Sequence, residues 1–346
     1  QSSSQKMLFN KIKKKYNFSK IRNLVESINK IKVLVIGEVI IDQYFFCEAI
    51  GKSGKEPVLA LKDIKNEHYL GGAGAICRHI SSFCNKITLL SMVGEKGEFI
   101  KDIKKSLPKN VKFNFIKKEN SPTIIKKRFL DNISYNKMLG VYSLNDDLLT
   151  KKDEKKFIKL LKKLISNHDL VITSDYGHGL ISKNSAKLIS RYSKYLALNA
   201  QINAANIGYH SMRNYKNVDC VIINENEIKH ELRDKNSSTK FLMKKLSSSK
   251  KINNLVVTRG IRGALLYNRI KNKFTACEAF ADNAVDKIGA GDALLSIIAL
   301  FFKKGLTNEL SLLAGSLAAA QSAETIGNKE SVNKTKILKT LEHILK

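Results

Sequence analysis

Six short apolar runs, most of them separated by segments of helical length, constrain the fold of this chain more than any other feature of its sequence. Apolar runs of strand length are typical of strands buried on both faces, and strands that alternate with helices form a parallel sheet. We therefore predict an α/β fold with a mostly parallel central sheet, covered by helices on both faces in three layers. The predicted strands are Val33–Ile36, Ile87–Val93, Leu170–Thr173, Tyr195–Leu198, Cys220–Ile223 and Leu255–Thr258.

Two segments interrupt this alternation of strands and helices. Residues 43–69 and 123–143 alternate polar and apolar side chains like exposed strands and contain no convincing helix. We expect them to form a small accessory sheet, or lid, beside the main domain. After Phe274 the pattern predicts helices to the end of the chain.

Residues 1–30 differ from the rest, because a polar start leads into a lysine-rich helical pattern. Two interpretations remain open, a linker that follows an upstream domain and a helical extension packed on the main domain. We place the main domain at 31–346. The apolar side of the helical pattern consists of Phe9, Ile12, Tyr16, Ile21, Leu24 and Ile28.

Composition excludes several classes of protein. Hydrophobic residues make up 43% of the 346, so a sizeable core is possible, and the longest apolar run, Ala293–Phe302, is shorter than the roughly 20 residues of a membrane-spanning helix. We expect no secretion, because no positive–apolar–small-residue pattern is found at the start of the sequence, and five cysteines without a C-x-x-C pair fit neither a disulfide framework nor a zinc cluster. We expect a soluble, reduced, cytoplasmic protein that does not bind membranes.

The formal net charge of +30 is the most conspicuous number, but its distribution favours a solvated surface. Only nine of the 61 basic residues are arginine, and the chain has no tryptophan. Nucleic-acid-binding proteins more often cluster arginine with aromatic platforms. We therefore predict no specific nucleic-acid partner, whereas attraction to anionic small molecules such as nucleotides and sugar phosphates is natural.

The segment Asp286–Asp292 is the strongest candidate for chemistry. It has the sequence Asp-Lys-Ile-Gly-Ala-Gly-Asp and leads directly into the apolar helical run that starts at Ala293. Glycines let the backbone approach a ligand, and a helix start presents free N–H groups to an anion. Asp292 could then accept the proton of an attacking hydroxyl while the amides face the developing charge. The structural alternative is a capped helix start with a tight glycine turn.

Other glycine-containing segments are weaker signals. The loop 258–263, Thr-Arg-Gly-Ile-Arg-Gly, follows a predicted strand, as in a nucleotide-phosphate loop or an ordinary hairpin. Gly37, Asp42 and the glycine run 70–74 could line a pocket at the carboxyl ends of parallel strands. The chain has no G-x-x-x-x-G-K-[ST] loop, and Cys77 stands where a dinucleotide fingerprint needs its third glycine.

Four motifs occur in a fixed order: Gly71-Gly72, Asn224-x-x-Glu227, Thr258-x-Gly260 and Asp286-x-x-Gly289-Ala290-Gly291-Asp292. In this order they resemble the ribokinase-like (PfkB-type) carbohydrate kinases, over about residues 31–345. Within that family the chain most resembles the kinase domain of the bifunctional heptose-phosphate kinase/nucleotidyltransferases of ADP-heptose synthesis. The narrower resemblance rests on Gly37-Glu38, Asp42-Gln43-Tyr44, Leu70–Ala73, Pro122-Thr123-x-x-Lys126-x-Arg128 and Ser174–Gly179.

The resemblance implies a transfer of phosphate from ATP to a sugar or sugar-phosphate hydroxyl, and a role for each matching residue. The implied catalytic residues are the base Asp292 and the anion hole Gly289, Ala290 and Gly291. The implied ATP and Mg²⁺ residues are Asn224, Glu227 (to Mg²⁺ through water), Thr258, Gly260 and Gly263.

The implied sugar-binding residues are Asp42, Gly71, Gly72 and Asp175, with Lys126 and Arg128 in reach of an anionic substituent. Lys126 and Arg128 are two residues apart on a predicted strand, so both face the same side, and Arg78 on a nearby helix could join them. Asp286 matches a residue that accompanies a monovalent cation site, such as one for K⁺. The lid often forms a homodimer interface in this family, and a nucleotidyltransferase domain could lie upstream.

The acceptor side departs from the heptose kinases at Ala75, His178 and residues 199–201, so the resemblance does not identify the sugar. Two other functions stay open. A nucleoside kinase of the same fold would be separated by a screen of nucleosides against sugars. A catalytically silent sugar- or nucleotide-binding regulatory module is opposed by Asp292 and would be recognised by a lack of ATP turnover.

Overall fold

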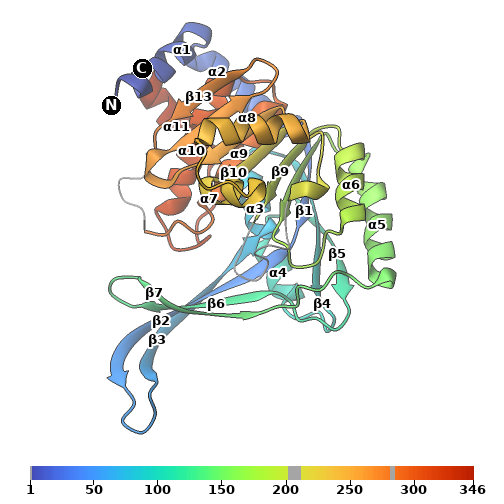
Figure 1. The fold of residues 1–346 in the computed structure, drawn as a ribbon, viewed down its shortest axis with the longest axis vertical. Coiled ribbons are helices and arrows are strands. Elements are labelled where there is room, and N and C mark those ends of the chain that lie inside the picture. The colour runs from blue at the N-terminus through green and yellow to red at the C-terminus, as the bar shows by residue number, and fades with distance from the viewer. Residues whose placement is uncertain (1, 202–211, 281–284) are drawn as a thin grey trace.

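The computed structural model describes residues 2–201, 212–280 and 285–346. In this part of the chain the largest sheet has nine strands in the order β13-β12-β11-β10-β9-β8-β1-β4-β5 (Figure 1). All neighbours from β11 to β5 pair in parallel, and only β12 and β13 are antiparallel. The predicted α/β fold with a mostly parallel sheet is confirmed. The strands are β1 (Lys32–Gly37), β4 (Lys86–Gly94), β5 (Val111–Lys118), β8 (Leu170–Asp175), β9 (Leu196–Ala200), β10 (Cys220–Asn224), β11 (Asn254–Thr258), β12 (Ala264–Asn268) and β13 (Lys273–Cys277).

The six predicted strands correspond to β1, β4, β8, β9, β10 and β11. Three strands were not predicted, and all lie at or next to an edge of the sheet. β5 alternates apolar residues with Lys and Asn, so it does not read as an apolar run. The prediction that the chain is helical after Phe274 was wrong for 275–277, which belong to β13.

Helices cover both faces of the sheet and bury two separate apolar cores. In β1, Val33 and Val35 point to one core while Leu34 and Ile36 point to the other, as strand alternation requires. Helices α3, α9, α10 and α11 contribute to the first core, and α5 to α8 to the second. The helices are α1 (Ser3–Lys15), α2 (Phe18–Glu26), α3 (Ala73–Ile80), α4 (Ile100–Ser106), α5 (Lys151–Ile165), α6 (Lys183–Tyr192), α7 (Glu225–Leu232), α8 (Thr239–Lys250), α9 (Ala290–Lys303), α10 (Asn308–Ala323) and α11 (Lys334–Leu345).

A second sheet of four strands, the lid, projects from the main body (Figure 1). Its strands, in the order β3-β2-β6-β7, are β3 (Leu59–Gly72), β2 (Val39–Lys52), β6 (Ile125–Asp131) and β7 (Lys137–Ser143). They contain the two segments predicted to form an accessory sheet, and that prediction is confirmed. Only Glu38 lies between the end of β1 and the start of β2, and β3 leads directly into α3.

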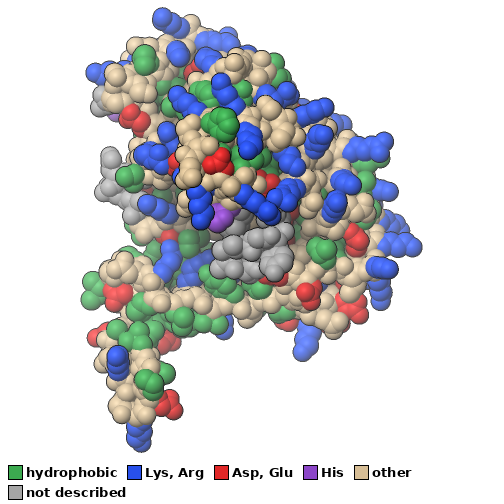
Figure 2. Space-filling model, in the orientation of Figure 1, with side chains coloured by type: hydrophobic (Ala, Val, Ile, Leu, Met, Phe, Trp, Pro, Cys, Tyr) green, Lys and Arg blue, Asp and Glu red, His purple; other side chains and the backbone are tan. Residues whose placement is uncertain are grey.

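The lid exposes an unusual number of large apolar side chains for a surface element. Figure 2 shows hydrophobic side chains gathered over the lid, whereas basic side chains are spread over the rest of this face. Solvent-exposed apolar patches of this kind are commonly interaction surfaces. The exposed residues are Ile50, Val58, Leu59, Ile64, Ile133, Tyr135, Leu139, Val141 and Tyr142.

Residues 2–30 form α1, α2 and a short 3₁₀ turn (Ser27–Lys30) that lie on the main body. α1 contacts β13, α10 and α11, and α2 contacts α11. The apolar side chains on their inner side, among them Ile12, Ile21 and Ile28, are fully buried in the first core. The residues therefore pack as a helical extension, while a domain boundary at residue 30 stays a prediction. Among the described helices, none is both long and apolar enough to cross a bilayer.

Candidate active site

The predicted motifs converge at the carboxyl edge of the large sheet, beside the base of the lid. Gly37 ends β1 and pairs with Ser174 on β8, and Asn224 at the end of β10 pairs with Thr258 at the end of β11. The carboxyl ends of parallel strands are where open α/β sheets bind ligands. The site is therefore assembled from segments far apart in the sequence.

The start of α9 forms an open glycine turn. Gly289 caps the helix with a left-handed backbone (φ 84°), and a Cβ there would lie 2.3 Å from the Asn328 side chain, so the turn requires glycine. A Cβ on Gly291 would meet nothing within 4 Å, and this residue is exposed. The amides of a first helical turn have no intrahelical partner and suit an anion. Here the Ala290 N–H makes one long hydrogen bond, to the Lys287 carbonyl at 3.4 Å.

Asp292 lies in that first turn and is held by a tyrosine. The Tyr176 hydroxyl donates a hydrogen bond to Asp292 Oδ2 at 3.0 Å. Burial raises the pKa of Asp292 to about 7, and Asp42 and Glu227 add to the rise, while the Tyr176 hydrogen bond and Lys126 oppose it. A carboxylate with a pKa near neutrality can accept a proton at physiological pH, as a general base must.

The Glu38 side chain fixes the loop that carries Tyr176 through hydrogen bonds to its backbone. This buried carboxylate accepts the backbone N–H groups of Tyr176 at 3.0 Å and His178 at 3.1 Å. Burial, together with Asp175, raises the pKa of Glu38 above its usual range. Glu38 therefore positions the tyrosine that in turn holds Asp292.

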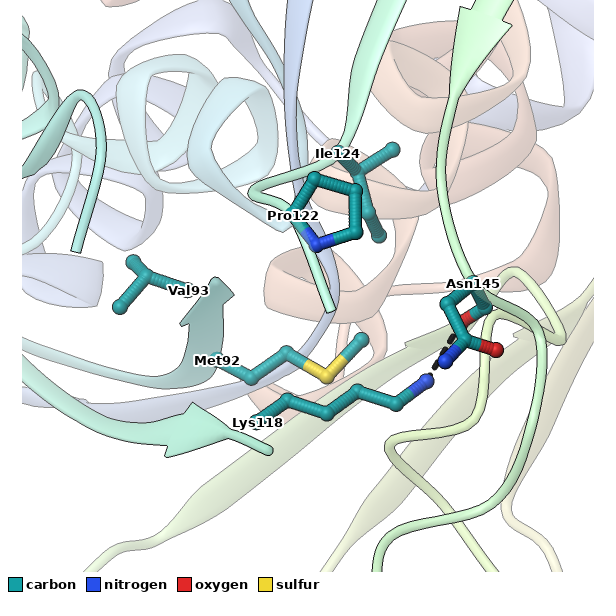
Figure 3. Close-up of a pocket in the computed structure, with 6 residues that line it drawn as sticks. All are labelled: Met92, Val93, Lys118, Pro122, Ile124 and Asn145. Atoms are coloured by element: carbon teal, nitrogen blue, oxygen red, sulfur yellow. Dashed lines mark hydrogen bonds between the residues drawn. The ribbon is translucent and has the colours of Figure 1, made fainter. Parts of the chain in front are cut away.

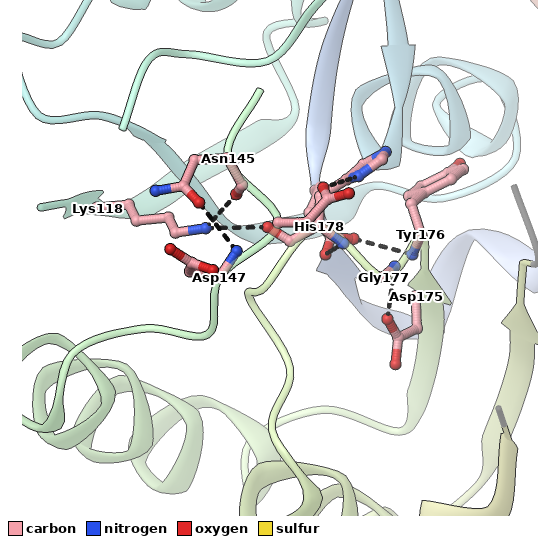
Figure 4. Close-up of polar contacts among 9 residues, drawn as sticks. Lys118, Asn145, Asp147, Asp175, Tyr176, Gly177 and His178 are labelled. Atoms are coloured by element: carbon pink, nitrogen blue, oxygen red, sulfur yellow. Dashed lines mark hydrogen bonds and ion pairs between the residues drawn. The ribbon is translucent and has the colours of Figure 1, made fainter. Parts of the chain in front are cut away.

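Asp175 ends β8 and is buried in the same loop. It accepts hydrogen bonds from the Tyr215 hydroxyl at 2.7 Å and the Gly177 N–H at 3.1 Å. Burial raises the pKa of Asp175 to about 6, and both hydrogen bonds lower it. Figure 4 shows Asp175 and Tyr176 on opposite sides of this turn.

Lys118 joins the loop at His178 to the segment after the lid. Its ammonium donates to the backbone carbonyls of Asn145 at 2.5 Å and His178 at 3.2 Å (Figure 4). The His178 ring contacts Asp146 through Nδ1 at 2.7 Å, and burial lowers the pKa of this histidine. Lys118 also borders a small hollow that contains none of the predicted site residues (Figure 3). Its lining residues are Met92, Val93, Lys118, Pro122, Ile124 and Asn145.

The base of the lid brings two cations and a carboxylate together. Arg128 Nη1 and Asp42 Oδ1 form an ion pair at 2.5 Å, and Lys126 is the register partner of Asp42 on the parallel strand. Lys126 and Arg128 lie 5.5 and 6.0 Å from the Tyr142 ring, so they share one face of β6, as predicted. A Cβ on Gly71 would lie 2.0 Å from Asp42 Oδ2, so glycine lets this carboxylate rest against the strand.

Arg78 does not join this pair. Its guanidinium donates to the backbone carbonyls of Asn328 at 2.7 Å and Lys329 at 3.1 Å. It therefore holds the loop that abuts Gly289. The expectation that Arg78 converges with Lys126 and Arg128 was wrong, because its guanidinium group is hydrogen-bonded to backbone carbonyls of a different loop.

The predicted nucleotide residues lie at the ends of β10 and β11. Asn224 and Glu227 form a capping box for α7, in which each side chain accepts the other's backbone N–H at 2.8 Å. Thr258 precedes a short 3₁₀ turn, Gly260–Arg262, and then Gly263 leads into β12, so the loop is a hairpin. Within the described ranges, no group of three or more His, Cys, Asp or Glu could hold a metal by itself.

Several residues that make contacts at the site were not predicted from the sequence to be functional. Glu38 and Tyr176 had been noted only as parts of matching strings and His178 only as a departure from the heptose kinases, whereas Lys118 and Lys137 had not been singled out. Their positions depend on pairings between distant segments. The signal that could have identified Glu38 is an acidic residue directly after an apolar strand.

Three comparisons place these features among known proteins. The pfkB family of carbohydrate kinases matches residues 30–335. The bifunctional protein HldE of Campylobacter jejuni (strain RM1221) is 24% identical over 305 residues, which are 87% of this chain and 62% of the relative. HldE of Haemophilus influenzae (strain PittEE) is 27% identical over 292 residues, 83% of this chain and 59% of the relative. The chain thus spans about three fifths of the length of these relatives.

Solved structures with low sequence identity share the fold. Phosphofructokinase-2 from Escherichia coli in complex with potassium aligns with a TM-score of 0.73 at 13% identity, covering 91% of this chain and 100% of that one. Arabidopsis thaliana ribokinase complexed with ribose and ATP aligns with a TM-score of 0.67 at 16% identity, covering 90% and 99%. The ribokinase-like fold expected from the motifs is confirmed. With the family match across most of its length, the chain belongs to the pfkB family of carbohydrate kinases.

Proposed function

We propose that this kinase transfers the γ-phosphate of ATP to a hydroxyl of a phosphorylated sugar, with Asp292 as the general base. The observation that carries the proposal is Asp292 itself. It lies in the first turn of α9 beside an open glycine, it accepts a hydrogen bond from Tyr176, and burial raises its pKa to about 7. A base and an anion-binding turn within one helical turn suit phosphoryl transfer.

The proposed step follows from these groups. The acceptor O–H loses its proton to Asp292, and its oxygen forms a bond to the γ-phosphorus. The bond from that phosphorus to the bridging oxygen breaks, and its electron pair leaves with ADP. The amides of Gly289, Ala290 and Gly291 would face the charge that develops on the transferring group.

The edge at β10 and β11 is suited to nucleotide phosphates and Mg²⁺. Gly260 leaves open space, since a Cβ there would meet nothing within 4 Å, and the Glu227 carboxylate lies at the start of α7. Asn224 and Glu227 would hold Mg²⁺ through water, and Thr258, Gly260 and Gly263 would contact the nucleotide. When bound, Mg²⁺ neutralises phosphate charge.

The charges at the base of the lid support a phosphorylated acceptor. Arg128 and Lys126 carry two positive charges, and Asp42 neutralises one, so the cluster keeps a net positive charge. Asp42, Gly71, Gly72 and Asp175 would hold the sugar. Phosphofructokinase-2 from Escherichia coli, which shares the fold, was also solved with fructose-6-phosphate. The resemblance of the sequence to the heptose-phosphate kinases makes a heptose phosphate the first acceptor to test.

The exposed apolar face of the lid favours self-association, and we infer a homodimer through this face. We expect light scattering after size-exclusion chromatography to give twice the chain mass, and Leu139→Lys on β7 to give the monomer. Ile261→Lys, which changes an exposed apolar residue away from the lid, is the control. A monomeric wild type would exclude the homodimer. The relatives are bifunctional and longer than this chain, which supports a second domain joined to this kinase in the full protein. The resemblance of the sequence suggests that this domain is a nucleotidyltransferase.

Activity is tested by measuring ADP release with a panel of acceptors. The panel contains heptose, hexose and pentose phosphates, the corresponding free sugars and nucleosides, each with ATP and Mg²⁺. We expect turnover with a phosphorylated sugar, lost in Asp292→Asn. Best turnover with a nucleoside would favour a nucleoside kinase, and no turnover with any acceptor would favour a regulatory module.

A further inference from the structure

The carboxylate of Asp286 is surrounded by hydrogen-bond donors. Oδ1 accepts the Lys137 ammonium at 2.6 Å and the Ile288 N–H at 3.1 Å. Oδ2 accepts the Gly327 N–H at 2.9 Å and the Tyr44 hydroxyl at 3.5 Å. A carboxylate offers about four acceptor positions on its two oxygens, and four donors face them here.

Lys137 supplies the positive charge at this carboxylate. The Asp286 side chain is only 3% exposed, and Lys137 reaches it from the start of β7 on the lid. Lys137 is its ion-pair partner within the described residues. A buried carboxylate without a compensating cation is strongly destabilising. The Tyr44 phenol is itself buried, and burial raises its pKa, so it stays a neutral donor.

This carboxylate lies at the foot of the anion-binding turn. Asp286 precedes the α9 cap Gly289 by three residues, and its side chain fixes the intervening Ile288 N–H. Its own N–H donates to the Ala323 carbonyl, and Oδ2 holds Gly327. Asp286 therefore connects the start of α9 to the loop after α10. Its negative charge is compensated by Lys137, which belongs to the lid.

We infer that Lys137 takes the place of the monovalent cation expected at Asp286, so that this kinase does not depend on K⁺. The inference rests on the proposed phosphoryl transfer at Asp292. K⁺ is bound by oxygen lone pairs, whereas both Asp286 oxygens already accept N–H and O–H groups. An ammonium at 2.6 Å occupies the position that a cation on Oδ1 would take. Lys137 is thus a positioning residue, which acts on the transferring phosphate through the turn at Gly289.

The kinetic test varies K⁺ at constant ionic strength, with tetramethylammonium as the other cation. Wild type is expected to change its kcat less than about twofold between zero and about 0.1 M K⁺. Lys137→Ala is expected to lose about tenfold in kcat without K⁺ and to recover most of it with K⁺ or NH₄⁺, with little change in the KM for ATP. Lys62→Ala, on an exposed face of β3, is the matched lid control.

A second readout does not need activity. Thermal melting of wild type is expected to be the same in K⁺ and tetramethylammonium, whereas K⁺ should raise the Tm of Lys137→Ala, because only the vacated carboxylate binds the ion. If Lys137→Ala does not fold, Lys137→Gln keeps the stem and removes the charge. Saturable K⁺ activation of wild type, or a K⁺-dependent rise in its Tm, would overturn the inference. Absence of ATP turnover under every condition would instead count against the proposed kinase reaction, and the melting test would still apply.

Discussion

The carboxyl edge of the large sheet and the base of the lid both present charged groups to the site, but they hold them in different ways. At the sheet edge, Glu38 and Asp175 are fixed by backbone N–H groups, and Asp292 is part of a helix. At the lid, Arg128 is held by Asp42 and Lys137 by Asp286, each across two segments. Backbone-fixed groups stay in place without substrate, whereas groups held by ion pairs can exchange partners with an anionic ligand.

This difference predicts a division of labour. Changes at the sheet edge should act mainly on kcat, because they alter groups that meet the transferring phosphate. Changes to the ion pair of Asp42 and Arg128 should act mainly on the KM of the acceptor. The following variants test this division, from the largest expected effect to the smallest.

Asp292→Asn should lower kcat by about 10²–10⁴-fold with a much smaller effect on ATP affinity, because it removes the base but little uniform binding. Steady-state rates of ADP release at saturating acceptor measure this effect. The control is Asp102→Asn, an exposed aspartate in the first turn of α4. If Asp292→Asn keeps more than about half of the activity, the base has been assigned to the wrong residue.

Arg128→Ala should raise the KM for a phosphorylated sugar about tenfold or more, equivalent to roughly 1.4 kcal/mol, and leave the KM for ATP nearly unchanged. Lys127→Ala is the control, because alternation on β6 turns Lys127 to the other face. Equal activity on free and phosphorylated forms of the best sugar, unaffected by Arg128→Ala, would shift the acceptor class to neutral sugars. If Arg128→Ala instead lowered kcat strongly without changing the KM of the acceptor, the proposed difference in role between the sheet edge and the lid would be wrong.

Tyr176→Phe should move the acidic limb of the kcat/KM profile to higher pH, by about half a unit to one unit. The Tyr176 hydroxyl lowers the pKa of Asp292, so its removal lets burial raise that pKa further above 7. Rates measured between about pH 5.5 and 9 give the midpoint. Tyr192→Phe, an exposed tyrosine on α6, should leave the profile in place. An unchanged midpoint in Tyr176→Phe would mean that this hydrogen bond does not tune the base.

Asp292→Asn should also raise the Tm by a few degrees at about pH 8, with the gain shrinking toward pH 5. The pKa of Asp292 is about 7 in the folded chain and 3.8 as its ordinary value. Below both values the carboxyl is protonated in either state, and the difference vanishes. As pH rises through this range, the unfolded chain ionises first, so the destabilisation of the folded state grows until pH 7 is passed and then stays at its full size. Calorimetry on both proteins at each pH measures the gain, and a constant difference would contradict the raised pKa.

The sequence predicted the sheet well, because buried strands are recognisable as apolar runs wherever they stand. Helix α5 is an equally local case, with lysines on one side and apolar Phe157 and Leu161 on the other. The edge strand β5 was missed because its partly exposed face mixes Lys and Asn into the run. The local pattern of apolar residues therefore identifies deeply buried strands and helices more readily than partly exposed ones.

Side-chain partners in the site were much harder to predict. The glycine turn before Asp292 is contained in seven consecutive residues, so its shape could be inferred from the motif. The contact of Lys137 with Asp286 joins residues 149 positions apart, and Tyr176 reaches Asp292 across 116. In a chain with 61 basic residues, nothing local distinguishes Lys137 from the others. Arg78 was misplaced for the same reason, since its carbonyl partners lie about 250 residues away.

The nearly direct junctions of the lid with the main body have a mechanical consequence. A single residue, Glu38, separates β1 from β2, and β3 passes into α3 without a break, so the lid is attached rigidly to β1, an inner strand of the large sheet. The lid should therefore bend along its whole length instead of rotating as a rigid body about a flexible hinge. Amide hydrogen exchange should therefore grade smoothly, slow near Ile41 at the root and fast near Lys52 and Leu59 at the tip. Motion of the lid that reaches the substrate would twist β1, which couples the outer end of the lid to a buried inner strand of the large sheet.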